Sequence, residues 1–230
     1  MLSQVFNRVE KKYLLDKEKY ELLMEAIKDN IKPDEFEYSK ICNIYYDTNN
    51  HELIRKSIEK PVYKEKVRLR SYGIPSLESK VFIEIKKKFK GIVTKRRTKL
   101  KLKEFYKYLE NGEFDETNQV LKEIDYCFKR YNLIPSIYIS YERHSFCGKE
   151  DKSFRLTFDT NIKSREYDLS LEKGDYGEYL LEEGNYLMEV KAIGGMPLWL
   201  AHVLAELKIY PTSFSKYGRI YKNNNFKEVI

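Results

Sequence analysis

Residues 64–70 read KEKVRLR, and every second residue of this stretch is a cation: Lys64, Lys66, Arg68 and Arg70. Successive side chains of a β-strand point to opposite faces, so this spacing places four positive charges on one face. Like charges at such short spacing repel each other. The stretch therefore predicts a strand whose charged face either stays wet or binds a strongly anionic partner, best of all several phosphates in a row.

The same alternation recurs along the chain. Each stretch has a largely apolar side and a charged side, which is typical of strands with a solvated, ion-lined inner face and helices or solvent outside. Together the stretches predict a sheet that encloses a charged cavity. They are RVEKKY at 8–13, VFIEIKKKF at 81–89, SIYISYERHSF at 136–146, SFRLTFDT at 153–160 and YLMEVKAI at 186–193.

The charged faces account for the whole net charge of +7, because they hold eleven cations and four acids. A protein that binds nucleic acid on its outer surface would more naturally carry its excess on exposed loops and helices. Lysine-rich faces kept for solubility are the alternative, but arginine dominates several positions and acids recur among them. The residues are Arg8, Lys12, Lys64, Lys66, Arg68, Arg70, Lys86, Lys88, Arg143, Arg155 and Lys191, with Glu10, Glu84, Asp159 and Glu189.

Length and composition predict one domain over residues 1–230, since no Pro/Gly/Ser-rich linker and no internal repeat interrupts the chain. Three widely spaced cysteines indicate a reducing compartment. No apolar run approaches the roughly 20 residues that cross a bilayer, and the N-terminus lacks the apolar stretch of a signal peptide. We therefore expect a cytoplasmic protein, with docking on the inner face of a membrane left open.

Turn signals and periodicity divide the chain into elements. Asp16 is a good N-cap for the first helix, and Asp47 or Thr48 for a short helix that contains Leu53 and Ile54. Strands are predicted at 6–15, 38–47, 63–71, 81–89, 136–146, 154–160 and 186–193, with a short one near 94–97. Further helices are predicted at 17–30, 102–110, 118–131 and 198–209, and a last one carries Lys216.

Eight stretches, in order from near residue 6 to near residue 222, resemble the polyphosphate polymerase domains of the vacuolar transporter chaperone (VTC) type. These domains belong to the triphosphate tunnel metalloenzymes, the CYTH-like superfamily. The stretches are FNRVEKKYLL, NIYYDT, EKVRLRSYG, VFIEIKKKFKG with VTKRR, YISYERHSF, FRLTFDTNI, LMEVKA and PTSFSKYGR.

The resemblance implies an α+β fold: an antiparallel β-barrel tunnel that threads polyphosphate, with helices outside and a C-terminal helix closing one end. It implies catalytic roles for Arg68, Arg70, Glu189 and Lys216, and a metal on Glu189. Glu10 and Glu84 are further metal candidates, although pairing with nearby cations explains them equally well. The phosphate-binding candidates, from the resemblance and the charged faces together, are Lys12, Lys66, Arg68, Arg70, Lys86, Lys95, Arg143, Arg155 and Lys191.

Two positions depart from the pattern of the superfamily. Its N-terminal ExExK is here Arg8-x-Glu10-x-Lys12, which replaces one acid by a base, as in the polymerase branch. Ser213 stands where the polymerases can carry another lysine, three residues before Lys216.

The expected reaction is metal-dependent transfer of the γ-phosphoryl group of ATP to a growing polyphosphate chain. Phosphoryl transfer asks a protein mainly for positioning and charge neutralisation. Arg68 and Arg70 are about 7 Å apart along a strand, near the reach of neighbouring phosphates. Carboxylate and water ligands favour Mg²⁺ or Mn²⁺.

Two other functions remain open: hydrolysis of tripolyphosphate or nucleoside triphosphates, and a sensor subunit that binds polyphosphate without catalysis. Fewer acids than cations favour the transferase. Among the residues, Lys64, Lys66 and Lys88 are alternatively solvated cations at the mouth of the cavity. Asp159 is expected to stabilise the turn at 160–161. ATP and polyphosphate are the expected partners, with a membrane protein as a further candidate that exports the product.

Overall fold

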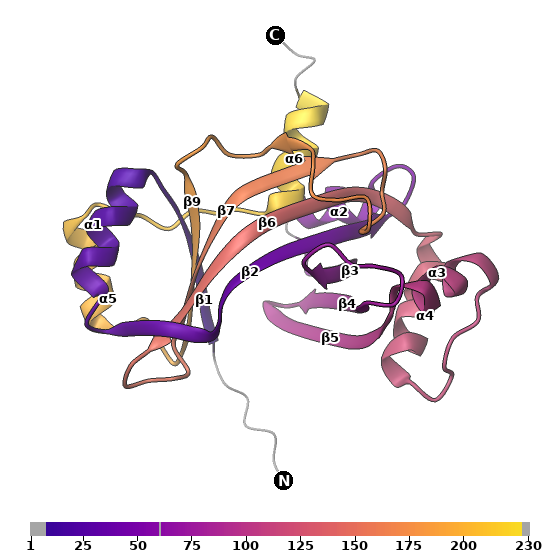
Figure 1. Ribbon diagram of the computed structural model, residues 1–230, viewed down its shortest axis with the longest axis horizontal. Helices are drawn as coiled ribbons and strands as arrows, with labels where there is room; N and C mark the ends of the chain where they lie inside the picture. Colours follow the sequence, from indigo (N-terminus) through magenta and orange to yellow (C-terminus); the bar gives the residue numbers. More distant parts are fainter. Residues whose placement is uncertain (1–7, 60, 227–230) are drawn as a thin grey trace. The chain divides into compact units, whose positions relative to one another are not determined.

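The computed structural model describes residues 8–59 and 61–226 (Figure 1). The strands are β1 (Arg8–Leu15), β2 (Ile31–Asp47), β3 (Tyr63–Tyr72), β4 (Lys80–Phe89), β5 (Ile92–Lys101), β6 (Ile134–Gly148), β7 (Arg155–Arg165), β8 (Glu178–Tyr179) and β9 (Tyr186–Ile193). The helices are α1 (Lys17–Ile27), α2 (Glu52–Ile58), α3 (Leu102–Asn111), α4 (Gln119–Tyr131), α5 (Leu198–Glu206) and α6 (Lys216–Phe226). The predicted α+β class is confirmed.

The predicted elements are present, but several strands are longer than expected. β2 begins at Ile31, whereas the sequence predicted a strand that begins at residue 38. β5 continues to Lys101, whereas the sequence predicted a short strand near 94–97. The first half of β2 is mostly exposed, so no apolar alternation marks it. The predicted first strand starts at Phe6, which lies outside the described residues. β8 was not predicted, since a strand of two residues has no detectable period.

The strands form one large antiparallel sheet in the order β1-β9-β7-β6-β2-β3-β4-β5, with β8 paired to β7. The order has two ends, so the sheet is open as described and the expected closure into a barrel is not observed. By contacts the chain divides into two compact units. Unit 1 holds the described residues up to Ser39, Tyr141–Ile162 and Leu181–Phe214; unit 2 holds Lys40–Ser140, Lys163–Leu180 and the residues from Ser215 onward.

The core of unit 1 lies between helices α1 and α5 and the apolar face of β1, β9 and β7 (Figure 1). Asp16 accepts a hydrogen bond from the Lys19 amide and begins α1 as predicted. The helix then buries Leu23 and Ile27 completely. Phe158 on β7 belongs to this core, together with Phe154 and Leu156. Because every second residue of the strand points to the same face, this alternation determines which face the helices cover.

The core of unit 2 lies between strands β2–β5 and helices α3 and α4. The rings of Tyr46, Phe105 and Phe128 meet there with centroid distances between 5.0 and 6.4 Å. Asp47 is fully buried and accepts hydrogen bonds from the amides of Leu53 and Ile54, which fixes the start of α2 as expected.

These cores cover one face of the sheet in each unit, and Arg68, Glu84 and Glu189 alternate with the core residues of their strands. None of the described helices has the length and apolar character required to cross a membrane. The prediction of a single domain over residues 1–230 stays a prediction.

Candidate functional site

The charged face of unit 2 is built from rows of facing residues on β3, β4 and β5. Cross-strand register places Arg68 opposite Glu84, and Glu84 opposite Arg97. The next row is made of lysines alone, with Lys66 opposite Lys86 and Lys86 opposite Lys95. Facing side chains in such a sheet are close neighbours, so the second row brings three lysines together beside the row that holds Glu84.

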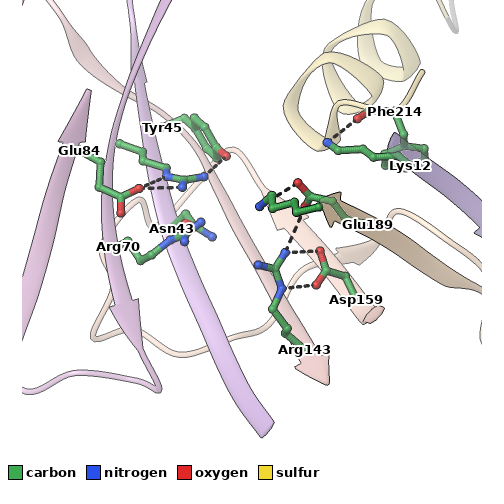
Figure 2. Close-up of polar contacts among 11 residues, drawn as sticks. Lys12, Asn43, Tyr45, Arg70, Glu84, Arg143, Asp159, Glu189 and Phe214 are labelled. Atoms are coloured by element: carbon green, nitrogen blue, oxygen red, sulfur yellow. Dashed lines mark hydrogen bonds and ion pairs between the residues drawn. The ribbon is translucent and has the colours of Figure 1, made fainter. Parts of the chain in front are cut away.

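Glu84 is the centre of the first ionic cluster, which we call the Glu84 cluster: Arg68, Glu84, Lys95 and Arg97, with Arg70 beside them. Two nitrogens of Arg68, Nε and Nη2, each lie 2.7 Å from Glu84 Oε2 (Figure 2). The other oxygen, Oε1, lies 2.7 Å from Lys95 Nζ and 3.8 Å from Arg97 Nη1. One buried carboxylate thus faces three cations, which leaves the cluster net positive.

This arrangement shifts the ionisation of its members. Burial disfavours the charge of Glu84, but Arg68, Arg70 and Lys95 outweigh it and lower the pKa of the carboxyl to about 2. Lys95 shifts in the opposite sense, because burial and the two arginines outweigh its contact with Glu84 and lower the pKa of its amine to about 8. Burial is the largest cause of this lowering and the two arginines add to it, so an anion beside Lys95 would favour its protonated form.

Arg70 has a neutral partner, Asn43, on the neighbouring strand β2. Its Nε donates to Asn43 Oδ1 at 2.9 Å, and the Asn43 amide donates to the Ile139 carbonyl at 2.9 Å (Figure 2). Asn43 is fully buried and Arg70 is 6% exposed. An arginine this buried is oriented by its contacts, so its guanidinium is pre-positioned for an anion.

Tyr45 lies beside Arg68 on the same face. Arg68 Nη1 donates to the Tyr45 hydroxyl at 3.0 Å. Burial alone raises the pKa of a phenol, but Arg68, Arg70 and Lys66 outweigh it here and lower the pKa of Tyr45 to about 7. Tyr45 was not among the predicted site residues, since an aromatic residue in a largely apolar strand carries no charge signal.

The start of α6 belongs to the same neighbourhood of unit 2. Lys66 Nζ donates to Ser215 Oγ at 3.3 Å, and the ring of Tyr217 lies 5.3 Å from that of Tyr45. Lys216, a predicted site residue, lies between Ser215 and Tyr217 in the sequence and is the first residue of α6. Lys64 instead donates to the Ser57 carbonyl at the end of α2.

The charged face of unit 1 forms a second cluster, which we call the Glu189 cluster: Lys12, Arg143, Asp159, Glu189 and Lys191. Register places Lys12 and Thr157 on either side of Glu189. Lys191 Nζ lies 3.0 Å from Glu189 Oε1, and Arg143 Nη2 lies 3.9 Å from Oε2 (Figure 2). Lys12 Nζ donates to the Phe214 carbonyl at 2.9 Å.

Two members of the Glu189 cluster, Glu189 and Arg143, are shifted toward their charged forms. Burial opposes ionisation of Glu189, yet Lys191, a hydrogen bond with Glu10, Lys12 and Arg143 lower the pKa of its carboxyl well below the ordinary range. Burial likewise opposes the charge of Arg143, but Asp159 raises the pKa of that guanidinium. Glu189 and Arg143 therefore remain ionised at neutral pH.

Two residues have partners that sequence reasoning did not assign. Asp159 was expected to stabilise a turn, but it is 1% exposed and accepts from Arg143 Nε and Nη2 at 2.6 and 2.8 Å. Arg155 was expected to bind phosphate, and in unit 1 it pairs with Asp34 at the exposed start of β2. Arg155 and Asp34 are 121 residues apart, and Arg143 and Asp159 lie 16 residues apart on successive strands, so each contact depends on how strands pair and not on a local pattern.

The residues around Glu189 suit a hard divalent cation. Mg²⁺ and Mn²⁺ are commonly held by one or two carboxylates together with substrate phosphates and water. Glu189 and Glu10 supply such a pair, and the Thr157 hydroxyl oxygen opposite Glu189 is buried without a hydrogen-bond partner in the described structure. Within residues 8–59 and 61–226, no group of three or more His, Cys, Asp or Glu side chains forms a cage, so the ligands of such an ion would include phosphate oxygens. Glu84 is less suitable, because its oxygens contact three cations.

The cations of β5 extend the site beyond the predicted residues. Lys95, Arg97, Lys99 and Lys101 repeat the alternation of residues 64–70, but only Lys95 was predicted as a site residue, from the family resemblance. The structure continues β5 to Lys101, and Lys99 faces Phe82 on the charged face. The same period-2 signal would have found them in a longer window.

The fold matches solved structures at low sequence identity. A proposed adenylate cyclase of Bacillus halodurans is 15% identical with a TM-score of 0.53, and covers 90% of this chain and 93% of its own. A proposed adenylyl cyclase of Hippeastrum with a dominant triphosphatase activity is 14% identical with a TM-score of 0.54, covering 94% and 96%. A protein of Vibrio parahaemolyticus, also a proposed adenylate cyclase, is 13% identical with a TM-score of 0.51, covering 94% and 98%. No curated protein matches the chain.

The antiparallel sheet with a cationic face in each unit, together with these neighbours, defines a protein of the triphosphate tunnel fold. A family model, the VTC domain, matches residues 7–223. The chain belongs to the VTC domain family, and the resemblance read from its sequence is confirmed.

Proposed function

We propose that this protein is an ATP-dependent polyphosphate polymerase, which transfers the γ-phosphoryl group of ATP to the end of an inorganic polyphosphate chain. The observation that carries the proposal is the Glu84 cluster. Its single buried carboxylate faces three cations, and Arg70 lies buried beside them. Such a cluster gains most from a ligand that brings several negative charges, as a chain of phosphates does.

The residues have separate roles in this reaction. Arg68 and Arg70 provide planar forks for phosphate oxygens, while Lys66, Lys86 and Lys95 provide compact charges. In unit 1, Lys12, Arg143 and Lys191 would hold phosphate in the same way. Arg155, as a partner of Asp34, would bind phosphate only after leaving that contact. Lys216 would add a cation at the start of α6.

A Mg²⁺ or Mn²⁺ ion on Glu189, with Glu10 as a second ligand, would supply charge neutralisation on phosphate oxygens when bound. The protein itself then contributes orientation. Since the acceptor is an anionic phosphate oxygen, a strong general base is not required, and fixed cations aimed at the transferring group provide the main stabilisation.

Under this proposal the partners are ATP and inorganic polyphosphate, and a cytoplasmic location supplies the ATP. A membrane protein that exports the product is a further proposed partner. A triphosphatase is the second candidate, because the structurally similar Hippeastrum protein has a dominant triphosphatase activity. Hydrolysis would use the same cations, with water in place of the growing chain as acceptor.

The decisive experiment incubates the pure protein with ATP and Mn²⁺ and measures long-chain polyphosphate and free phosphate. Long chains support the polymerase, free phosphate without chains supports the triphosphatase, and neither product overturns both. Arg68→Ala with Arg70→Ala should weaken polyphosphate binding. The magnitude of its logarithmic salt dependence should fall by roughly one for each arginine removed.

A matched control variant removes the same two positive charges from helices instead of from the sheet. Lys107→Ala with Lys129→Ala removes two exposed lysines of α3 and α4, whose side chains are 65% and 71% exposed. This variant should retain the affinity and salt dependence of the wild type. Equal salt dependence in the two double variants would place the anion elsewhere.

A further inference from the structure

Tyr45 has a contact that the proposed chemistry does not use. Its hydroxyl accepts from Arg68 Nη1 at 3.0 Å, while Nε and Nη2 of the same guanidinium contact Glu84. The centre of the guanidinium also lies 5.8 Å from the Tyr45 ring. Glu84 thus occupies Nε and Nη2 of Arg68, and the phenol oxygen occupies Nη1. A phosphate oxygen could accept a hydrogen bond from Nη1 in the same way.

The groups around Tyr45 come from several elements of unit 2. Lys66, Arg68 and Arg70 on β3 are the charges that act on it. Glu84 on β4 and Lys95 on β5 join the set through their contacts with Arg68 and with each other. From α6, Tyr217 packs near its ring and hydrogen bonds to Asp47 at 2.9 Å. Positive charge dominates the surroundings of the hydroxyl, which favours its ionised form near neutral pH.

We infer that the Tyr45 oxygen holds the place at Arg68 that an incoming phosphate oxygen takes, and that phosphate binding releases Tyr45 together with the uptake of one proton. The inference rests on the proposed binding of phosphate at the Glu84 cluster. Before binding, the phenolate offsets part of the charge of Arg68, Arg70 and Lys66. When the phosphate supplies that negative charge, the phenolate oxygen takes one proton from solvent and becomes a neutral hydroxyl.

The proton balance makes affinity depend on pH in a defined direction. The pKa of Tyr45 is about 7 without ligand, and nearby phosphate charge raises it. One pH unit above that pKa, binding must first protonate the phenolate, which weakens it about tenfold. Tyr45→Phe keeps the ring and removes the ionisable oxygen, so this part of the pH dependence should disappear.

The test measures tyrosinate absorbance and calorimetric binding of tripolyphosphate for the wild type, Tyr45→Phe and the control Tyr126→Phe. Tyr126 is 63% exposed on α4, outside both clusters. Without ligand, the wild type and the control should show one tyrosine ionising near pH 7, and Tyr45→Phe should lack this step. Saturating tripolyphosphate should abolish the step. From about pH 6 to about pH 8, wild-type affinity should fall about tenfold more than that of Tyr45→Phe.

The outcomes separate this inference from the proposed function. Calorimetry that detects no tripolyphosphate binding overturns both. Binding with an unchanged tyrosinate step, or with the same pH dependence in Tyr45→Phe as in the wild type, overturns the role of Tyr45 alone. A purely structural role of the tyrosine would change affinity equally at all pH values.

Discussion

Replacing Glu84 with glutamine removes the negative charge that Arg68 and Lys95 both contact at 2.7 Å. Because those cations lower the pKa of the carboxyl from 4.5 to about 2, ionised Glu84 stabilises the folded state at neutral pH by about 3 kcal/mol. Glutamine keeps the shape but leaves the cations uncompensated, so Glu84→Gln should lower the free energy of unfolding by about this amount.

The effect of pH follows from the sign of the shift. A lowered pKa in the folded state adds stability above the ordinary value of 4.5, and this contribution disappears as the pH falls through about 2. Urea denaturation at neutral pH and at about pH 3 should therefore show a difference between wild type and Glu84→Gln that shrinks by more than half on acidification.

Glu78→Gln is the matched control, because Glu78 also contacts two lysines but its side chain is 60% exposed. Glu78→Gln should lower the free energy of unfolding much less than Glu84→Gln does, since water screens exposed ion pairs. In the same variants, tripolyphosphate should bind Glu84→Gln more tightly at low salt, because the cluster gains net positive charge. Equal unfolding free energies for Glu84→Gln and Glu78→Gln at neutral pH would refute the reasoning.

Three more outcomes are expected. Glu189→Gln should abolish Mn²⁺-dependent turnover while circular dichroism shows an unchanged fold; unchanged activity would remove the metal from this carboxylate. Asp159→Asn should lower the free energy of unfolding in urea by about 3 kcal/mol, because it leaves buried Arg143 without its bidentate partner; a wild-type midpoint would contradict this. Lys95 loses its proton around pH 8, so tripolyphosphate affinity should fall between about pH 7 and about pH 9, and less so in Lys95→Met; calorimetry that finds the same fall in both would exclude Lys95.

The elements and the charged faces were predictable because their signals are local. Alternation at 64–70 or 186–193 depends only on the period of two in a strand, and the Asp16 cap depends on an amide three residues away. The family resemblance rested on the same local stretches, which is why it held over residues 7–223. Where a strand lacks apolar alternation, as in the first half of β2, the prediction failed.

The partner of each charge could not be predicted, because it depends on the register with which different strands pair. Asp159 pairs with Arg143 and Arg155 with Asp34, although each had another expected role. Ionisation could not be predicted either, since burial and the summed field of several cations set it. Tyr45 and Lys95 have lowered pKa values only because β2, β3, β4 and β5 bring them beside Arg68.

The amino-acid sequence alone determined which side chains stand on a charged strand face and to which family the chain belongs. Only the tertiary structure decided that Glu84 lies buried among three cations, that Asp159 pairs with Arg143, and that the Tyr45 hydroxyl accepts from Arg68. The physical reason is range. Side-chain alternation is imposed by the backbone within a few residues, whereas Coulomb interaction depends on distance in space and on burial, which exist only after strands far apart in the chain have paired.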